Sequence, residues 1–361
     1  LQRMIPLMQE LGLEVEWQIL EAPSAFYDVT KKLHNALHGK REVLNASMRE
    51  LFLRVNEDNA KRLALDAQIV FIHDPQPIAL VKHRRAASKS RWVWRCHIDL
   101  SRPMRSAWEL LAPWIPKYDA AIFSSAAFAQ RMPMRQVLIP PSLDPLSDKN
   151  RPLSQDEVRE ILKRLEVPQD RPIITQVSRF DYLKDPIGVI DAFRQVRRSF
   201  KCRLMLVGGP ATDDPEGEEV LAAVRERVNN DPEIHILMLP PHSDLEINAL
   251  QQASRVVVQK SIREGFGLTV AEALWKSKPV VASAVGGIPL QVRHRYSGLL
   301  VHSIDGAAFA IKQLLGSPDY ARRLGENGRE HVRQNFLLTR QMTDYLAVFA
   351  SLGHHKDTIR L

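Results

Sequence analysis

The stretch Arg255–Leu274, RVVVQKSIREGFGLTVAEAL, decides the fold class of this chain. Its first five residues form a short apolar run that predicts a buried β-strand, and Gly265 and Gly267 then interrupt the pattern. The apolar residues that follow predict a helix that begins near Gly267. A short buried strand that leads through a tight turn into a helix is typical of parallel βαβ units.

The second half of the chain repeats this pattern. Ser154 is expected to cap a helix over 157–165. Besides 255–259, strands are expected at 172–177, 204–207, 234–238, 279–283 and 298–301. Six such strands predict a doubly wound α/β sheet, because right-handed crossovers place helices on both of its faces.

The first half shows a similar alternation. Strands are expected at 14–20, 68–73, 91–97, 120–124 and 136–140. The proline-rich segment 140–145 can continue neither a helix nor a strand, so we expect one Rossmann-like domain over 1–145 and a second over 146–335. Two such domains are expected to face a central cleft and to bind ligand at the carboxyl ends of their strands.

Composition excludes several classes of protein. The chain has 361 residues, 45% hydrophobic and 25% charged, which fits two globular domains and excludes a disordered chain. Cys96 and Cys202 belong to no CxxC pair, which argues against a disulfide framework or a thiolate zinc site and favours the cytoplasm. No apolar run is long enough to span a membrane.

The net charge of +8 fits an anionic ligand, or it serves solubility alone. The basic stretch 82–91 lacks the interleaved aromatic residues of a single-strand platform, so nucleic acid is not expected as a partner. The expected partners are therefore small molecules. The sequence is compatible with a homodimer but does not fix the assembly.

The turn 261–267 is the strongest candidate for ligand contact. Backbone N–H groups and the dipole of the helix that follows can hold a phosphate, and glycine allows its close approach. Glu264 stands before this helix, and Glu272 lies inside it, on a turn that could reach a ribose. An ordinary strand-to-helix turn with solvent-facing acids is the alternative.

Arg179 and Lys184 follow the expected strand 172–177. Two cations on one loop can converge on a diphosphate, because arginine supplies a planar fork and lysine a point charge. A solvated loop is the alternative interpretation.

In the first domain, His73 and Asp74 follow one expected strand, and His97 and Asp99 follow the next. These side chains can orient sugar hydroxyls or cap the next helix. A metal site would need a third ligand with suitable spacing, and none is evident.

The ordered combination of Arg179 and Lys184, Gly208–Gly209, the E-x7-E pattern from Glu264 to Glu272, and Gly286–Gly287 resembles the retaining glycosyltransferases of the GT-B fold, family four. In the first half, the stretches HDPQP (73–77), WRCHIDLS (94–101) and PPSLDPLS (140–147) look like those of trehalose glycosyltransferring synthases and the related retaining trehalose phosphorylases.

The resemblance implies transfer of glucose from a nucleoside diphosphate glucose to free glucose, giving trehalose with retained anomeric configuration. It implies the following roles: Arg179, Lys184, Glu264 and His97 are catalytic; Gly265, Phe266, Gly267, Leu268, Thr269 and Glu272 bind the donor; His73, Asp74 and Asp99 face the acceptor. No metal or other cofactor is implied, because side chains and helix ends supply the positive charge.

The resemblance also leads to expectations for the first and the last residues of the chain. In this family a glycine-rich loop precedes the first helix, whereas Leu1 looks like the inside of that helix, so weak activity or none is expected from this chain alone. The segment 336–361, with a helix over 339–352, is expected to pack back on the first domain.

Other functions stay open at this point. A trehalose phosphorylase would use glucose 1-phosphate, and Glu272 would then have no ribose to hold. A degenerate, non-catalytic sugar-nucleotide-binding protein is a second alternative. The sequence does not identify the nucleotide base of the donor.

Overall fold

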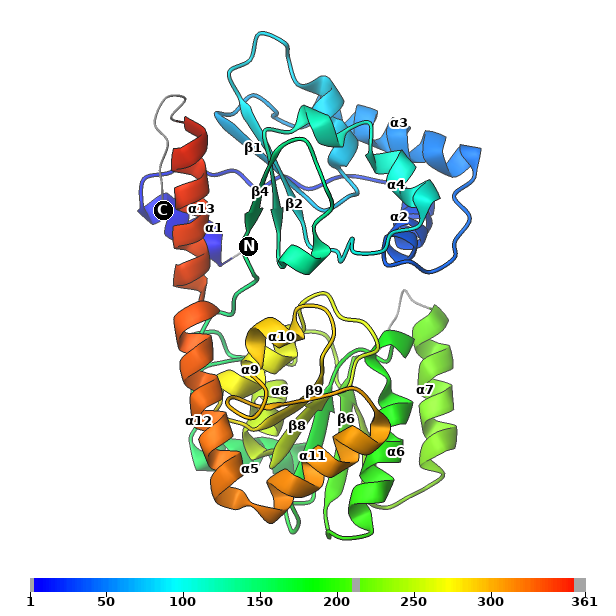
Figure 1. The fold of residues 1–361 in the computed structure, drawn as a ribbon, viewed down its shortest axis with the longest axis vertical. Helices are drawn as coiled ribbons and strands as arrows, with labels where there is room; N and C mark the ends of the chain where they lie inside the picture. The colour runs from blue at the N-terminus through cyan, green and yellow to red at the C-terminus, as the bar shows by residue number, and fades with distance from the viewer. Residues whose placement is uncertain (1–2, 210–214, 354–361) are drawn as a thin grey trace. The chain divides into compact units, whose positions relative to one another are not determined.

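The computed structural model describes residues 3–209 and 215–353 (Figure 1). The chain divides into two compact units, of which unit 1 comprises Leu1–Pro140 with Gln341–Leu361, and unit 2 comprises Pro141–Arg340. The boundaries expected from the sequence, 145/146 and 335/336, lie close to these divisions. Each unit holds one parallel sheet.

Unit 1 has a four-stranded sheet in the order β1-β2-β3-β4. Its strands are β1 (Ile69–His73), β2 (Arg91–Cys96), β3 (Ala120–Phe123) and β4 (Arg135–Leu138). Its α-helices are α1 (Met4–Glu10), α2 (Ser24–Leu37), α3 (Ala46–Arg62), α4 (Arg105–Leu111) and α13 (Leu338–Gly353), and short 3-10 helices cover Ile78–His83, Ile115–Lys117 and Ala126–Phe128.

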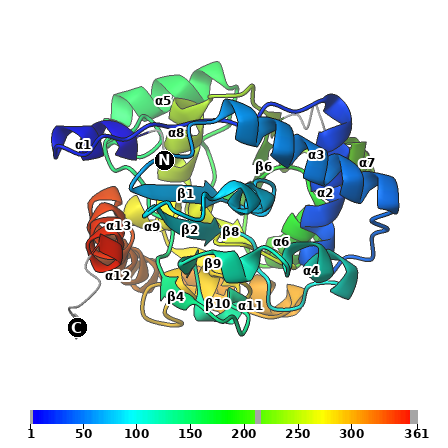
Figure 2. The same cartoon turned by 90° about the horizontal axis from the view of Figure 1, so that it is seen from above.

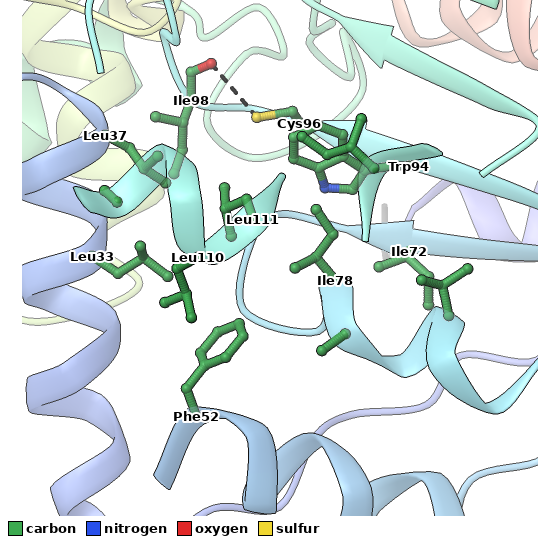
Figure 3. Close-up of a cluster of buried hydrophobic side chains, with 14 of the residues drawn as sticks. Leu33, Leu37, Phe52, Ile72, Ile78, Trp94, Cys96, Ile98, Leu110 and Leu111 are labelled. Carbon is green, nitrogen blue, oxygen red and sulfur yellow. Dashed lines mark hydrogen bonds between the residues drawn. The ribbon is translucent and has the colours of Figure 1, made fainter. Parts of the chain in front are cut away.

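The core of unit 1 forms where α2, α3 and α4 pack on β2. Figure 3 shows Leu33, Phe52 and Leu111 in one apolar cluster with Trp94, and all four are buried. The thiol of Cys96 donates to the carbonyl of Ile98 at 3.7 Å, and burial raises the pKa of this thiol. The cysteine therefore serves packing rather than reaction.

The last helix, α13, packs on β1. The ring of Phe71 meets those of Tyr345 and Phe349 edge-on, with centroids 5.3 and 5.9 Å apart. The side chain of Gln341 also donates to the carbonyl of Pro140 at 3.3 Å. The chain thus returns to the first unit at its end, and Figure 1 shows α13 in red beside this sheet.

The expected strand at 14–20 is wrong. The segment has no strand assignment, and Trp17 and Ile19 are 51% and 70% exposed. Leu20 packs partly buried against the core of unit 1, but the exposed Trp17 and Ile19 leave the segment without a continuous buried face, and side-chain hydrogen bonds hold it instead. The amide of Gln18 donates to the Ala64 carbonyl at 3.3 Å and accepts from the Ala64 N–H at 2.9 Å.

Unit 2 has a six-stranded sheet in the order β10-β9-β8-β5-β6-β7. Its strands are β5 (Ile173–Val177), β6 (Arg203–Gly208), β7 (Ile234–Met238), β8 (Val256–Gln259), β9 (Val280–Ser283) and β10 (Leu299–Val301). All six were expected from the sequence. Its helices are α5 (Gln155–Arg164), α6 (Pro186–Arg197), α7 (Pro215–Val228), α8 (Asp244–Ala253), α9 (Leu268–Trp275), α10 (Ile288–Gln291), α11 (Ile304–Gly316) and α12 (Pro318–Asn335), and a 3-10 turn covers Tyr182–Lys184.

Helices cover both faces of this sheet because alternate strand residues point to opposite sides. Ile174 belongs to the apolar cluster that contains α6 and α11, whereas Ile173 and Val177 belong to the cluster with α5 and α8. Figures 1 and 2 show α6 beside α11 and α5 beside α8 on opposite faces of the sheet. The doubly wound architecture predicted for this unit is confirmed.

Candidate active site

The strand order of unit 2 contains one reversal. The chain runs from β5 outward through β6 to β7, and then crosses back to β8 on the other side of β5. In open α/β sheets, ligands bind outside the carboxyl ends of the strands at such a switch point. The loops that follow β5 and β8 therefore mark the candidate ligand site of this unit, and they carry Lys184 and Glu264.

Lys184 and Glu264 meet at this point. The ammonium of Lys184 lies 2.7 Å from Glu264 Oε2, and the two side chains are 19% and 8% exposed. The hydroxyl of Ser261 donates to the same carboxylate oxygen at 3.1 Å. The backbone of Ile262 also donates to the carbonyl of Leu183 at 2.8 Å, so the two loops are tied together. The result is a nearly buried charge pair at the switch point.

Glycines allow the loops after β5 and β8 to take their positions. A Cβ on Gly286 would lie 1.7 Å from the carbonyl oxygen of Glu264, and Gly286 has a φ of +56°. Gly287 donates its N–H to the carbonyl of Gly265 at 2.9 Å. Gly208, the last residue of β6, lies so close to the Ser178 carbonyl that a Cβ there would be 2.5 Å from it.

Helix α9 begins directly after this loop. Its N-cap residue, Gly267, has a left-handed φ of +79° and supplies no side-chain hydrogen bond to the first turn. The amides of Leu268 and Thr269 thus begin the helix without a side-chain cap, as a phosphate site at a helix N-terminus requires. The ring of Phe266 packs on Phe336 in the core, so only its backbone is available to a ligand.

Glu272 lies in the second turn of α9, and its side chain is buried. The ammonium of Lys149 lies 3.4 Å from Glu272 Oε1, while Glu272 Oε2 is buried and has no hydrogen-bond partner in the part of the chain that the structure describes. The ammonium of Lys276 donates to the carbonyl of Glu272 at 3.2 Å, and burial lowers the pKa of Lys276 to about 8. A buried oxygen without a donor fits a site that a ligand hydroxyl would complete.

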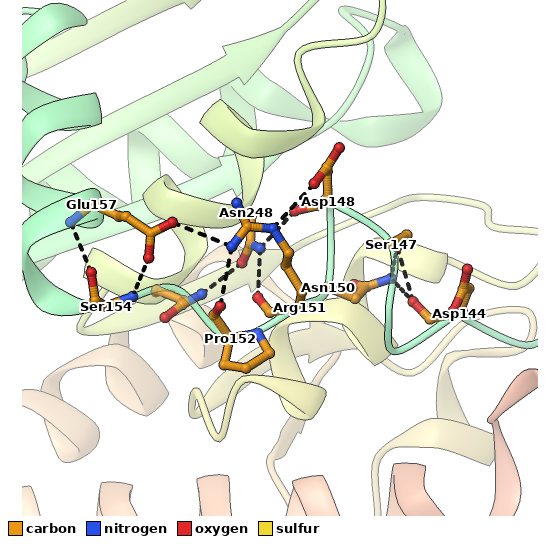
Figure 4. A network of polar contacts seen from close by, with 10 residues as sticks. Asp144, Ser147, Asp148, Asn150, Arg151, Pro152, Ser154, Glu157 and Asn248 are labelled. Atoms are coloured by element: carbon orange, nitrogen blue, oxygen red, sulfur yellow. Dashed lines mark hydrogen bonds and ion pairs between the residues drawn. The ribbon is translucent and has the colours of Figure 1, made fainter.

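A network of side-chain hydrogen bonds holds the segment before α5, to which Lys149 belongs (Figure 4). The side chain of Asn150 donates to the carbonyl of Asp144 at 3.0 Å. Asn248, on α8, donates to the carbonyls of Asp148 and Arg151 at 2.7 and 2.9 Å. This network folds residues 144–151 against the sheet domain and brings Lys149 to Glu272.

Two expected site residues, Arg179 of unit 2 and Asp99 of unit 1, do not join these clusters. The guanidinium of Arg179 is 70% exposed and lies 3.4 Å from the carboxylate of Asp181. Asp99 accepts from the N–H of Ser101 at 2.8 Å, which is a local turn contact. Both follow strands, as expected, but the structure shows neither in contact with the other candidate residues.

In unit 1, the structure brings His73 and His97 together. His73 is the last residue of β1 and His97 directly follows the adjacent β2, and His73 Nδ1 lies 3.2 Å from His97 Nε2 in stacked rings. Asp74 has a left-handed φ of 68° and accepts from the His97 N–H at 3.0 Å. Trp94 donates its indole N–H to the carbonyl of Asp74 at 3.0 Å.

Both histidines are neutral at physiological pH. Burial, followed by the charge of the fully buried Arg95, lowers the pKa of His73 to about 3 and that of His97 to about 2. Burial also raises the pKa of Asp74, against the lowering effect of its hydrogen bond from His97. One neutral imidazole can donate to the other, so the pair offers hydrogen-bond groups for a polar substrate rather than a positive charge.

Sequence reasoning missed Lys149 and Ser261. Lys149 lies far from Glu272 in the sequence, so no local pattern indicates their contact. Ser261 belongs to the turn 261–267, and its position three residues before Glu264 indicates a contact across this turn.

No group of three or more His, Cys, Asp or Glu side chains that could hold a metal ion occurs within residues 3–209 and 215–353. Across the same described ranges, no helix is both long and apolar enough to cross a membrane.

Two family models match this chain. Residues 1–130 match the family described as trehalose synthase, N-terminal domain, and residues 157–331 match glycosyl transferases group 1. The trehalose synthase of Pyrococcus horikoshii is 43% identical over 360 residues, which cover 98% of this chain and 86% of that protein. That of Rubrobacter xylanophilus is 44% identical over 359 residues, covering 97% and 86%. A trehalose phosphorylase of Pleurotus pulmonarius is 27% identical over 385 residues, covering 91% and 52%.

Solved structures show the class of fold. The α,α-trehalose 6-phosphate synthase of Burkholderia multivorans matches with a TM-score of 0.74 at 17% identity, covering 91% of this chain and 84% of that one. A sucrose-phosphate synthase of Thermosynechococcus elongatus matches with a TM-score of 0.70 at 20% identity, covering 86% and 81%. The fold is therefore that of the GT-B glycosyltransferases. Within this class, the chain belongs to the trehalose synthase family.

Proposed function

We propose that this protein transfers glucose from a nucleoside diphosphate glucose to free glucose and forms α,α-trehalose. The observation that carries the proposal is the 43% identity with a trehalose synthase over 98% of the chain. The charge pair of Lys184 and Glu264 at the switch point, followed by an uncapped helix N-terminus, supports a phosphorylated sugar as the donor.

In the proposed step, the bond between the anomeric carbon and the phosphate oxygen breaks, and its electron pair leaves with the diphosphate. The acceptor hydroxyl oxygen bonds to the same face of that carbon, and its proton passes to the leaving phosphate oxygen. Arg179 and Lys184 stabilise the negative charge that develops on the diphosphate, as preorganised cations do in many transferases. No protein nucleophile and no metal take part.

The other groups position the two sugars. Glu264 and the amides of Gly265, Phe266 and Gly267 bind the glucose of the donor, and Leu268 and Thr269 bind its phosphate through their N–H groups. Glu272 binds the ribose, which supplies the donor that Glu272 Oε2 lacks. In unit 1, His97 contacts the reacting sugar, and His73, Asp74 and Asp99 act on the acceptor side.

Donor binding requires the Lys184–Glu264 pair to open. In the structure the ammonium of Lys184 pairs with the carboxylate of Glu264. An incoming diphosphate would bind the ammonium instead, and the sugar hydroxyls would bind Glu264.

The free Cys96 and Cys202 are both buried, which agrees with a proposed cytoplasmic location.

Product analysis tests the proposal. The complete protein is incubated with glucose and, in separate arms, with the glucose conjugates of several nucleoside diphosphates, with glucose 1-phosphate and with maltose. Trehalose is expected only in arms that contain a nucleoside diphosphate glucose. Trehalose from glucose 1-phosphate alone would establish the phosphorylase instead, and donor binding without trehalose in any arm would indicate a non-catalytic binding protein.

A further inference from the structure

A pocket lies in unit 2, away from the residues of the candidate active site. It has a volume of about 640 Å³, within the range of small-molecule sites. Pro172, Lys201, Arg255 and Lys278 line it, and each directly or closely precedes one of the strands β5, β6, β8 and β9. Because these strands are parallel, the pocket opens at the edge of the sheet where they begin. The candidate active site lies at the opposite edge, where they end.

The charged side chains that line this pocket are all cationic. They are Arg159, Arg171, Lys201, Arg255 and Lys278, and no Asp or Glu lines the pocket. Arg159 pairs with Asp156, and Arg171 pairs with Glu233. Within residues 3–209 and 215–353, no ion pair or side-chain hydrogen bond is found for the other three.

Lys278 makes the pocket unlike an ordinary basic surface. Its ammonium is largely removed from water, and burial together with the charge of Arg255 lowers its pKa. A desolvated cation beside a second cation is unfavourable unless an anion joins them. Phe200 and Leu315 add apolar wall, and Gln169 and Gln252 add amide groups.

We propose that this pocket binds a phosphorylated small molecule. Lys278, Arg255 and Lys201 would hold the phosphate, because they have no carboxylate partner and converge from three strand starts. The amides of Gln169 and Gln252 would meet hydroxyls, and the apolar wall would pack on the remainder of the ligand. The site is separate from the donor site, so both can be occupied at once.

Binding of inorganic pyrophosphate, measured by titration calorimetry, tests the proposal. The wild-type chain is expected to bind two equivalents, one at each edge of the sheet. The variant Arg179→Gln/Lys184→Gln removes the donor-side site and is expected to bind one equivalent. Adding Arg255→Gln and Lys278→Met to this background is expected to weaken the remaining site at least tenfold. Glucose 6-phosphate in place of pyrophosphate shows whether a sugar adds affinity.

Matched variants separate this result from damage to the fold. Arg159→Gln lines the same pocket but removes an arginine already paired with Asp156, so less than a threefold change is expected. Arg255→Gln and Lys201→Gln replace exposed side chains and keep the test valid if the Lys278 variant unfolds. The proposal is overturned if the donor-side double variant binds no pyrophosphate, or if Arg255→Gln and Lys201→Gln leave its affinity within twofold. Neither result tests the donor site. The donor site is tested separately, by the loss of one equivalent of pyrophosphate between the wild-type chain and the donor-side double variant.

Discussion

At the scale of single residues, the pair of Lys184 and Glu264 is the central charged contact of the candidate site. Lys184→Met leaves a nearly buried carboxylate without its cation, so the free energy of unfolding should fall by roughly 3 kcal/mol. Lys184→Met/Glu264→Gln removes both charges and should recover most of this loss. Urea unfolding gives the free energy of unfolding of each variant. Arg179→Gln is the control, since its exposed side chain should change stability by less than about 0.5 kcal/mol. Equal losses in the single and double variants would contradict a coupled pair.

The two histidines of unit 1 predict acid sensitivity. Their pKa values, about 3 and about 2, lie below the unfolded value of 6.5, so between these limits the unfolded state binds more protons than the folded one. Stability should therefore fall as the pH drops from 7 to 5, by up to roughly 2 kcal/mol for each histidine. His73→Asn/His97→Asn should flatten this dependence, measured as the melting temperature across the range. Asp74 acts in the opposite sense, because its pKa is raised. An unchanged slope in the double variant would show that other groups cause the acid loss.

At the scale of elements, Gly286 determines where the loop after β8 lies. Gly286→Ala places a Cβ against the Glu264 carbonyl and adds left-handed strain. Gly12→Ala is the matched control, because Gly12 has a φ of +85° but no atom within 4 Å of its Cβ position. The Gly286 variant should be less stable than the Gly12 variant by roughly 1–3 kcal/mol in thermal or urea unfolding. Similar losses in both would show that the close approach costs nothing.

The elements also show what local pattern can predict. The strands β5 and β8 are short, fully buried and rich in β-branched residues, so hydrophobic runs locate them, and Ser154 forms the expected cap with Glu157. The segment 14–20 has a similar pattern but no neighbouring strand, because pairing depends on the fold rather than on the segment itself.

At the scale of the whole molecule, the parallel topology explains which site contacts were predictable. His73 ends β1 and His97 directly follows the neighbouring parallel strand β2, so their proximity follows once β1 and β2 pair in register. Lys184 and Glu264 meet because β5 and β8 are neighbours at the switch point. The contact of Lys149 with Glu272 depends on a folded connecting segment and on Asn248, and no sequence pattern contains that information.

The affinity of a nucleoside diphosphate for the Glu272→Gln variant tests whether the donor of this protein is a sugar nucleotide. Titration calorimetry compares the tightest-binding nucleoside diphosphate with inorganic pyrophosphate, for the wild-type chain and for this variant. We expect nucleoside diphosphate affinity to fall at least tenfold, because the ribose loses a buried carboxylate, while pyrophosphate affinity stays within twofold. If the nucleoside diphosphate binds both chains equally, Glu272 holds no ribose, and if it binds the wild-type chain no better than pyrophosphate, the nucleoside is not recognised; either result contradicts the proposed donor site.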